Sequence, residues 1–340
     1  MKISVIWAWN RGLALSDVLA YNGNNVLVYS RCAAGAEEIN THHTAKKYLW
    51  DTKIDRKIKA TCELKETLDF SNYIVIAVPS KSIIPLLQEI RDTKSSDNYF
   101  FINATKWFTN KKTIQQTINE FFPIHRWLAS VLWPWFAKEL IEKNITCACA
   151  VSINESEALF VQALFSNDYF RLYAQNDVIW AEVYAAIKNT IAMASWIITW
   201  LWYENNTKAS LITRWLKEMS TVGNILWAKE ETFLWLTGLG DLILTCSSCE
   251  SRNFKAWYEI WKDNSAKRFL KNNKATVEWL ATIWVIEEIA QKYNLELPIL
   301  HALYLIIYED AKPSNMLKKI MQRPLIREHN TQNQKDISTI

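Results

Sequence analysis

Glycine is scarce in this sequence. The chain has 340 residues but only 6 glycines, whereas average usage predicts about 24 in a chain of this length. Tryptophan deviates in the opposite direction, with 18 residues. A turn that needs a bare backbone therefore has few glycines to supply it. The glycine and tryptophan counts together match the expected number of glycines.

Long apolar runs are also absent. No stretch reaches the roughly 18 apolar residues of a membrane-spanning helix, and the N-terminus lacks the pattern of a signal peptide. We therefore expect a cytoplasmic protein without membrane insertion. Because 340 residues are too many for one ordinary core, we also expect two domains.

The chain lacks a strong charge of one sign. Lys and Arg exceed Asp and Glu by only four, which does not favour a nucleic-acid surface and leaves room for a small anionic substrate. The spacing of Cys147, Cys149, Cys246 and Cys249 could supply a zinc site. Neither pair lies in a recognisable zinc knuckle, so we favour buried reduced thiols and expect no metal.

Short apolar runs rich in β-branched and aromatic residues occur in the first half of the chain. They are residues 2–6, 25–31, 73–78 and 99–105. Such runs are typical of parallel strands that are covered on both faces. Helical periodicity lies between them, for example at 13–22 and 82–91. This alternation predicts an α/β fold with a Rossmann-like, doubly wound sheet.

From about residue 180 the apolar residues recur at spacings of three and four, which predicts successive helices. The sequence after about residue 322 loses this periodicity. We therefore expect an α/β domain at 1–179, an all-α domain at 180–322 and a disordered tail at 323–340.

The turn after the first strand reads WAWNRG, at residues 7–12. A dinucleotide-binding unit carries G-x-G-x-x-G there, and only Gly12 is present. Those glycines allow the tight turn, the approach of the pyrophosphate and close helix packing, while N–H groups at the helix start bind the anion. An ordinary strand–helix turn is the alternative. Arg31, at the end of the second strand, suits the 2′-phosphate of NADP unless it is a solvated surface arginine.

Three further stretches carry side chains that suit a phosphorylated polyol. They are INATKWF at 102–108, AAIKNTIA at 185–192 and GLGDLILTCSSCESRN at 238–253. Lys106 and Lys188 are candidates for charge stabilisation and proton transfer, because a lysine desolvated beside another cation titrates near neutrality. Solvated surface lysines are the alternative.

The order of motifs over residues 2–322 resembles the bacterial type of NAD(P)-dependent glycerol-3-phosphate dehydrogenase. The motifs are WAWNRG at 7–12, AVPS at 77–80, KW at 106–107, WPWFAKE at 133–139, AIKN at 186–189, LITRW at 211–215, GLGDL at 238–242, SRN at 251–253 and VEW at 277–279. The resemblance implies an NAD(P)-binding Rossmann domain, then an all-α substrate and catalytic domain like that of 6-phosphogluconate dehydrogenase. It also implies a homodimer that reversibly reduces dihydroxyacetone phosphate to sn-glycerol 3-phosphate, feeding glycerophospholipid synthesis.

The same resemblance assigns roles to individual residues. Lys188 would be the catalytic general acid and base. The implied substrate-binding positions are Lys106, Trp133, Trp135, Lys188, Asp241, Ser251, Arg252 and Asn253. The implied cofactor-binding positions are Trp7, Trp9, Asn10, Arg11, Gly12, Arg31, Tyr48, Lys106, Ala137, Arg252, Thr276 and Glu278. Arg31 favours NADP, but the family commonly accepts both cofactors, so we expect NADP or NAD.

The resemblance also bears on the missing glycines. Many tryptophans stand where the family has, or commonly has, glycine: Trp7, Trp9, Trp107, Trp133, Trp180, Trp196, Trp200, Trp202, Trp215, Trp227, Trp235, Trp257, Trp261 and Trp279. We hypothesise that UGA codons, read as glycine in the source organism, are written here as tryptophan. If the tryptophans are genuine, the alternative is an inactive nucleotide-binding protein. Another alternative, a 2-hydroxyacid or ketopantoate reductase, is disfavoured by GLGDL and SRN.

Overall fold

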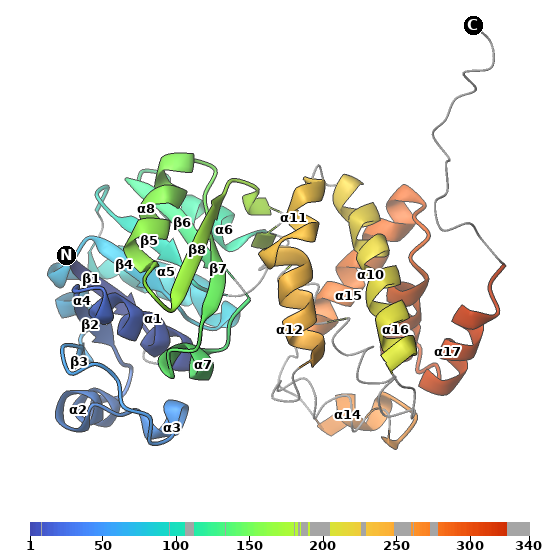
Figure 1. The fold of residues 1–340 in the computed structure, drawn as a ribbon, viewed down its shortest axis with the longest axis horizontal. Helices are drawn as coiled ribbons and strands as arrows, with labels where there is room; N and C mark the ends of the chain where they lie inside the picture. Colours follow the sequence, from blue (N-terminus) through green and yellow to red (C-terminus); the bar gives the residue numbers. More distant parts are fainter. Residues whose placement is uncertain are drawn as a thin grey trace, which may run out of the picture.

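The computed structural model describes most of the chain. The described residues are 1–7, 9–94, 96–105, 112–132, 134–179, 181–182, 184, 190, 205–225, 229–247, 260, 262–272 and 278–324. They form an α/β body in the N-terminal half and a helical body in the C-terminal half (Figure 1).

The α/β body is built on one sheet in the order β3-β2-β1-β4-β5-β6-β7-β8. Neighbouring strands pair in parallel except β6 and β7, which are antiparallel. The strands are β1 Lys2–Ile6, β2 Asn25–Tyr29, β3 Lys59–Thr61, β4 Tyr73–Ile76, β5 Phe100–Asn103, β6 Trp127–Leu132, β7 Thr146–Val151 and β8 Phe170–Gln175. The step from β1 to β4 is the switch point beside which such sheets bind nucleotides.

Helices cover both faces of the sheet, and the helical body follows. In the α/β body they are α1 Asn10–Tyr21, α2 Ala33–His42, α3 Lys46–Leu49, α4 Leu64–Phe70, η1 Ser80–Ser82, α5 Ile83–Thr93, α6 Ile114–Phe121, α7 Ala137–Ile141 and α8 Glu155–Phe165. In the helical body they are α10 Asn205–Ile225, α11 Glu230–Leu234, η2 Leu236–Gly240, α12 Asp241–Ser247, α14 Lys267–Asn272, α15 Glu278–Tyr293, α16 Pro298–Tyr308 and α17 Pro313–Met321.

Among the described residues, three apolar cores hold these layers together. On one face of the sheet, α1, α7 and α8 pack against the strands through residues such as Leu13, Leu140 and Val161. On the other face, α4, α5 and α6 form a second core. The helical body has its own core, in which α10, α15 and α16 meet. The predicted α/β fold with an all-α second half is confirmed.

The predicted strands are confirmed as β1, β2, β4 and β5, three of them shorter than the predicted runs. The sequence did not predict β3, β6, β7 or β8, or the antiparallel pairing of β6 with β7. The boundary between 179 and 180 stays a prediction. Of the predicted tail, residues from 325 onward lie outside the described residues.

A single row of paired residues runs across the whole sheet. In spatial order the row consists of Thr61, Tyr29, Ile6, Ile76, Asn103, Ser130, Val151 and Gln175. Every strand except β6 ends at its member of this row, and β6 continues to Leu132. The segments after β1, β2, β3, β4 and β5 therefore leave the sheet along one line, at the carboxyl ends where open α/β sheets bind ligands. Because β7 is antiparallel to β6, β7 and β8 reach the row from the opposite side.

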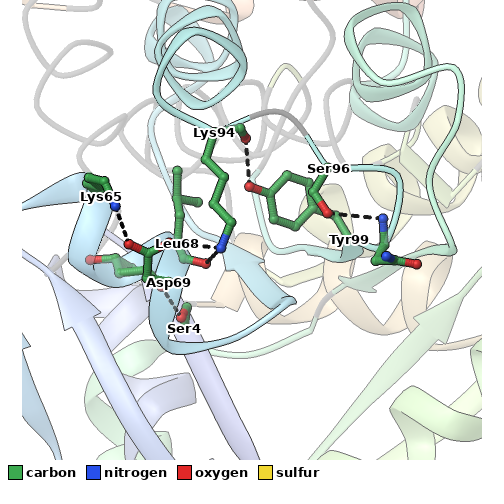
Figure 2. Close-up of polar contacts among 9 residues, drawn as sticks. Ser4, Lys65, Leu68, Asp69, Lys94, Ser96 and Tyr99 are labelled. Carbon is green, nitrogen blue, oxygen red and sulfur yellow. Dashed lines mark hydrogen bonds and ion pairs between the residues drawn. The ribbon is translucent and has the colours of Figure 1, made fainter.

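Polar contacts also connect α4, the end of α5 and the start of β5, at the strand ends opposite to the row (Figure 2). Lys94 Nζ donates hydrogen bonds to the carbonyl oxygen of Leu68 at 3.0 Å and to Asp69 Oδ1 at 2.9 Å. The buried hydroxyl of Tyr99 donates to the carbonyl oxygen of Lys94 at 2.7 Å, and burial raises the pKa of Tyr99 to about 12. These contacts fix the start of β5, which is the end of that strand opposite to the row.

Some features are absent from the described part of the chain. None of its helices is long and apolar enough to cross a membrane. Nor does any group of three or more His, Cys, Asp and Glu side chains there have the geometry of a metal site. The side chains of Cys149 and Cys246 are buried, whereas Cys249 lies outside the described residues.

Candidate active site

The turn after β1 has the backbone of a glycine-rich turn. Trp7 directly follows the strand and has a φ of 101°, in the region that favours glycine. A Cβ atom on Gly12 would stand only 2.1 Å from the carbonyl oxygen of Trp7, so α1 packs against the strand end as only glycine allows. The first and last glycine positions of the fingerprint therefore both have glycine geometry.

Side chains crowd this turn. The rings of Trp7 and Trp9 meet edge to face at 5.7 Å, and Trp9 stacks on Tyr48 at 5.7 Å. The guanidinium of Arg31 lies 5.0 Å from the centre of the Trp7 ring, and Trp7 is only 7% exposed. Four predicted cofactor positions are therefore together at the ends of β1 and β2. The two indoles lie among them, where a nucleotide-binding turn has bare backbone.

The next predicted cofactor residues begin helices. Asn10 is the first residue of α1, and its Oδ1 accepts a hydrogen bond from the backbone N–H of Arg11 at 2.9 Å. Ala137 is buried at the start of α7, which packs against α1. Glu278 is the first residue of α15 in the helical body.

The GLGDL motif forms η2 and the start of α12. A Cβ atom on Gly238 would stand 2.3 Å from the carbonyl oxygen of Phe233, so a side chain cannot fit there. Asp241 opens α12 and is 1% exposed. Burial raises the pKa of Cys149 in β7 and of Tyr184, and the nearby charge of Asp241 adds to both shifts. Asp241 directly follows η2, which packs against β7 of the sheet.

Direct contacts join the two bodies around this motif. Gln175, the last residue of β8, donates from Nε2 to the Thr237 hydroxyl at 3.1 Å. The rings of Tyr173 and Trp235 lie 5.6 Å apart. Asp177 Oδ2 accepts hydrogen bonds from the backbone N–H of Lys229 at 3.0 Å and from a threonine hydroxyl of α11 at 2.8 Å.

The segment after β6 also reaches the GLGDL motif. A Cβ atom on Gly240 would stand 3.6 Å from Cγ of Pro134, so the two segments are in contact. Trp135, a predicted substrate position, is 3% exposed, and its ring lies 6.4 Å from that of Phe170 in β8. Its side chain is therefore packed in the α/β body.

Sequence reasoning missed one buried group at this junction. Glu182 is 2% exposed and accepts hydrogen bonds from Asn103 and Ser130, two neighbouring members of the row. The available signal was a single glutamate in the otherwise uncharged stretch AEVYAAI, shortly before Lys188.

Seven predicted site residues lie outside the described residues. They are Lys106, Trp133, Lys188, Ser251, Arg252, Asn253 and Thr276. The described structure therefore supplies the frame of the site: the turn after β1, the row and the GLGDL motif.

Comparison with known proteins covers both bodies. The N-terminal family profile of NAD-dependent glycerol-3-phosphate dehydrogenase matches residues 2–158, and the C-terminal profile matches residues 177–318. The NAD(P)+ glycerol-3-phosphate dehydrogenase of Staphylococcus epidermidis is 36% identical over 326 residues, which are 95% of this chain and 98% of that protein.

Solved structures agree with this match. The glycerol-3-phosphate dehydrogenase of Coxiella burnetii is similar with a TM-score of 0.83 at 26% identity, over 95% of this chain and 99% of that chain. The enzyme of the same name from Plasmodium falciparum has a TM-score of 0.86 at 22% identity, over 96% of this chain and 97% of that one, and supports the fold alone. From these matches, the chain belongs to the NAD-dependent glycerol-3-phosphate dehydrogenase family.

Proposed function

We propose that the protein reversibly reduces dihydroxyacetone phosphate to sn-glycerol 3-phosphate with NADH or NADPH. The observation that carries this proposal is the placement of the GLGDL motif. Its η2 turn packs against β7 of the same sheet whose first turn has the glycine geometry of a dinucleotide site, and the buried Asp241 follows that turn directly. Family membership connects that arrangement to the reaction.

In this proposal the cofactor supplies the hydride, and the chain binds substrate and moves the proton. Lys188 donates a proton to the carbonyl oxygen during reduction and takes it back in the reverse direction. Lys106 and Asp241 hold the substrate, and backbone near Trp133 and Trp135 contacts it. Ser251, Arg252 and Asn253 surround the phosphate, for which an arginine fork is well suited.

The cofactor fits the backbone of this site but not the two indoles. The positive φ of Trp7 and the contact at Gly12 suit a pyrophosphate turn. The Trp7 and Trp9 side chains lie against each other and against Arg31 and Tyr48, in the positions proposed for cofactor contact. Asn10, Arg11, Ala137, Thr276 and Glu278 complete the proposed contacts.

We infer that the native protein has glycine at Trp7, Trp9 and the other tryptophans at family glycine positions. The backbone of Trp7 supports this, because its φ of 101° lies in the region that favours glycine. The indole N–H groups of Trp7 and Trp215 are buried without a hydrogen-bond partner among the described residues. Buried tryptophans usually have one.

Packing energy gives a further reason. Overpacking a close site costs about 1–3 kcal/mol, so a dozen such sites would exceed the roughly 5–15 kcal/mol stability of a typical domain. Intact-mass spectrometry of the protein from its own organism tests the inference. We expect a mass well below the 39.7 kDa of the tryptophan sequence and UGA at each of these codons. A mass of 39.7 kDa would refute it.

Activity is tested with the glycine-containing protein, dihydroxyacetone phosphate and NADPH. We expect consumption of NADPH, and we expect Lys188→Ala to abolish it while NADPH binding stays nearly unchanged. Binding of NADPH without turnover in the parent protein would support the inactive nucleotide-binding alternative instead. Turnover retained by Lys188→Ala would refute the role of that lysine.

The proposal extends to a cytoplasmic homodimer that feeds glycerophospholipid synthesis. It also keeps the domain boundaries at 1–179 and 180–322, with 323–340 as the tail. Sedimentation equilibrium should give twice the monomer mass, and a monomer at micromolar concentration would contradict the dimer. Limited proteolysis should remove the tail first.

A further inference from the structure

The buried carboxylate of Glu182 accepts four hydrogen bonds at the junction of the two bodies. Oε1 of Glu182 accepts from the Ser130 hydroxyl at 2.8 Å and from Asn103 Nδ2 at 3.2 Å. Oε2 accepts from the backbone N–H of Ile114 at 2.6 Å and from that of Gln115 at 3.4 Å. The donors come from β5, β6 and the start of α6, so Glu182 joins three elements of the α/β body.

The donors are themselves linked. Gln115 Nε2 donates to the Ser130 hydroxyl at 2.9 Å and to the carbonyl oxygen of Val151 at 3.0 Å. Asn103 Nδ2 lies 3.1 Å from the same hydroxyl. Three adjacent members of the row, on β5, β6 and β7, are therefore held by one network around the carboxylate.

Two of the donors stand on either side of the segment that carries Lys106. Before it, Asn103 ends β5, and its Oδ1 accepts a hydrogen bond from the backbone N–H of Thr105 at 2.8 Å. Thr105 directly precedes Lys106. After it, Ile114 begins α6, whose start is closed by a capping box. One carboxylate thus binds Asn103 and Ile114, the two residues that flank the segment 104–113.

Glu182 is also the point at which the chain enters the helical body. Two residues later, Tyr184 is fully buried, with its ring 5.7 Å from that of Trp215 and 6.1 Å from that of Phe233. Lys188 follows six residues after Glu182. Glu182 therefore precedes the second lysine, Lys188, closely along the chain.

We propose that Glu182 is a positioning residue of the dehydrogenase reaction, which fixes the segment carrying Lys106 relative to the segment carrying Lys188. The inference rests on the proposed function, because the roles of the two lysines come from the family. Glu182 acts through these segments and does not touch the substrate. Its contribution is to hold them in the geometry that proton transfer requires.

The chemistry of the donors explains why an acid stands here. Both carboxylate oxygens accept, whereas a glutamine has one accepting oxygen and an NH₂ group that only donates. Two of the four donors would then face a donor or lose their partner. Burial raises the pKa of Glu182 to about 7, and the hydrogen bonds from Ser130 and the backbone of α6 oppose that rise.

The chain offers a matched control in Glu218. This residue of α10 is also buried, and burial raises its pKa to about 7. Its two oxygens accept from the backbone N–H groups of Ile299 at 2.8 Å and Leu300 at 3.1 Å, at the start of α16. Glu218→Gln therefore removes a similar buried carboxylate within the helical body, away from the row.

The test compares Glu182→Gln with Glu218→Gln in the glycine-containing enzyme. For Glu182→Gln we expect kcat with dihydroxyacetone phosphate to fall at least tenfold, while the KM for NADPH stays within twofold. For Glu218→Gln we expect both constants within twofold of the parent. Amide hydrogen exchange at Thr105, Ile114 and Gln115 should become faster only in Glu182→Gln. Ser130→Ala should also lower kcat with dihydroxyacetone phosphate, by a smaller factor, and leave the KM for NADPH within twofold.

Several outcomes would overturn the proposal. A folded Glu182→Gln enzyme that keeps its kcat would do so, as would an equal loss of kcat in Glu218→Gln. If Glu182→Gln does not fold, Ser130→Ala decides, and unchanged kinetics there contradict the proposal. If the parent has no turnover, the proposed function fails. In that case, unchanged hydrogen exchange at the three amides in Glu182→Gln separately refutes the positioning role of Glu182.

Discussion

The carbonyl oxygen of Trp7 lies 2.1 Å from the point where a Cβ atom on Gly12 would stand. The close neighbour is backbone, not the end of a flexible side chain. Any substitution at Gly12 must therefore move α1 away from the end of β1. Because α1 begins at Asn10, such a shift also moves the N–H groups that a pyrophosphate would use.

Gly12→Ala should therefore destabilise the protein by about 1–3 kcal/mol and weaken NADPH binding at least tenfold. Gly35→Ala is the control, because the atom nearest to a Cβ there is the side-chain hydroxyl oxygen of Ser30, at 3.0 Å, and not a backbone atom. Chemical unfolding and NADPH fluorescence titration measure the two effects. Equal behaviour of the two variants would contradict the role of the close contact.

Arg31→Asp should change the choice of cofactor. The exposed guanidinium stands at the end of β2 beside the turn, where a cation attracts the 2′-phosphate and an acid binds the ribose hydroxyls of NADH. We expect the KM for NADPH to rise at least tenfold and that for NADH to change less than threefold. Arg91→Ser, on the exposed side of α5, serves as the control. An equal change for both cofactors would refute selection by Arg31.

Glu218 should make stability depend on pH. Burial raises its folded-state pKa to about 7 from a reference of 4.5, although Arg214 and Arg323 partly oppose the shift. Between these values the folded state keeps a proton that the unfolded state has lost. Rising pH therefore destabilises the parent protein relative to Glu218→Gln, by about 3 kcal/mol in total.

Urea unfolding of both proteins at pH 5 and pH 8 measures this difference. The gap between their unfolding free energies should change in favour of Glu218→Gln as the pH rises. Glu182 is present in both proteins, so its own titration cancels. A gap that stays constant across this range would mean that Glu218 has an ordinary pKa.

Tyr99→Phe should affect stability alone. The fully buried hydroxyl donates to the carbonyl oxygen of Lys94, and its loss leaves that acceptor with one hydrogen bond fewer. We expect a loss of about 1 kcal/mol with kcat and KM unchanged, because this contact lies at the sheet edge away from the row. Thermal unfolding and steady-state kinetics check both parts. A changed kcat would show that the two edges are coupled.

The sequence predicted β1, β2, β4 and β5 because each is an apolar run buried on both faces. It missed β7, read as a pair of cysteines, because TCACAV has small side chains and few β-branched ones. It also missed β8, FRLYAQ, whose burial alternates at the sheet edge. The antiparallel pairing of β6 and β7 depends on tertiary packing, which local pattern does not encode.

The candidate site, too, could be predicted from the sequence only in part. Motif order identified the turn at 7–12 and the GLGDL motif without any structure. It could not identify Glu182, because the donors to that carboxylate lie up to 79 residues away in sequence. Strand register brings Asn103 and Ser130 side by side, and register depends on how the whole sheet pairs.

The row of paired residues makes strand length a functional quantity. One residue inserted in β5 would turn Asn103 to the other face of the sheet and displace Lys106 by about 3.3 Å. An insertion at the opposite edge, near Asp97, would leave the row in place. Relatives of this protein should therefore vary in loop length at that edge and agree in strand length at the row. The lengths of the strands thus determine where the residues that follow the row lie.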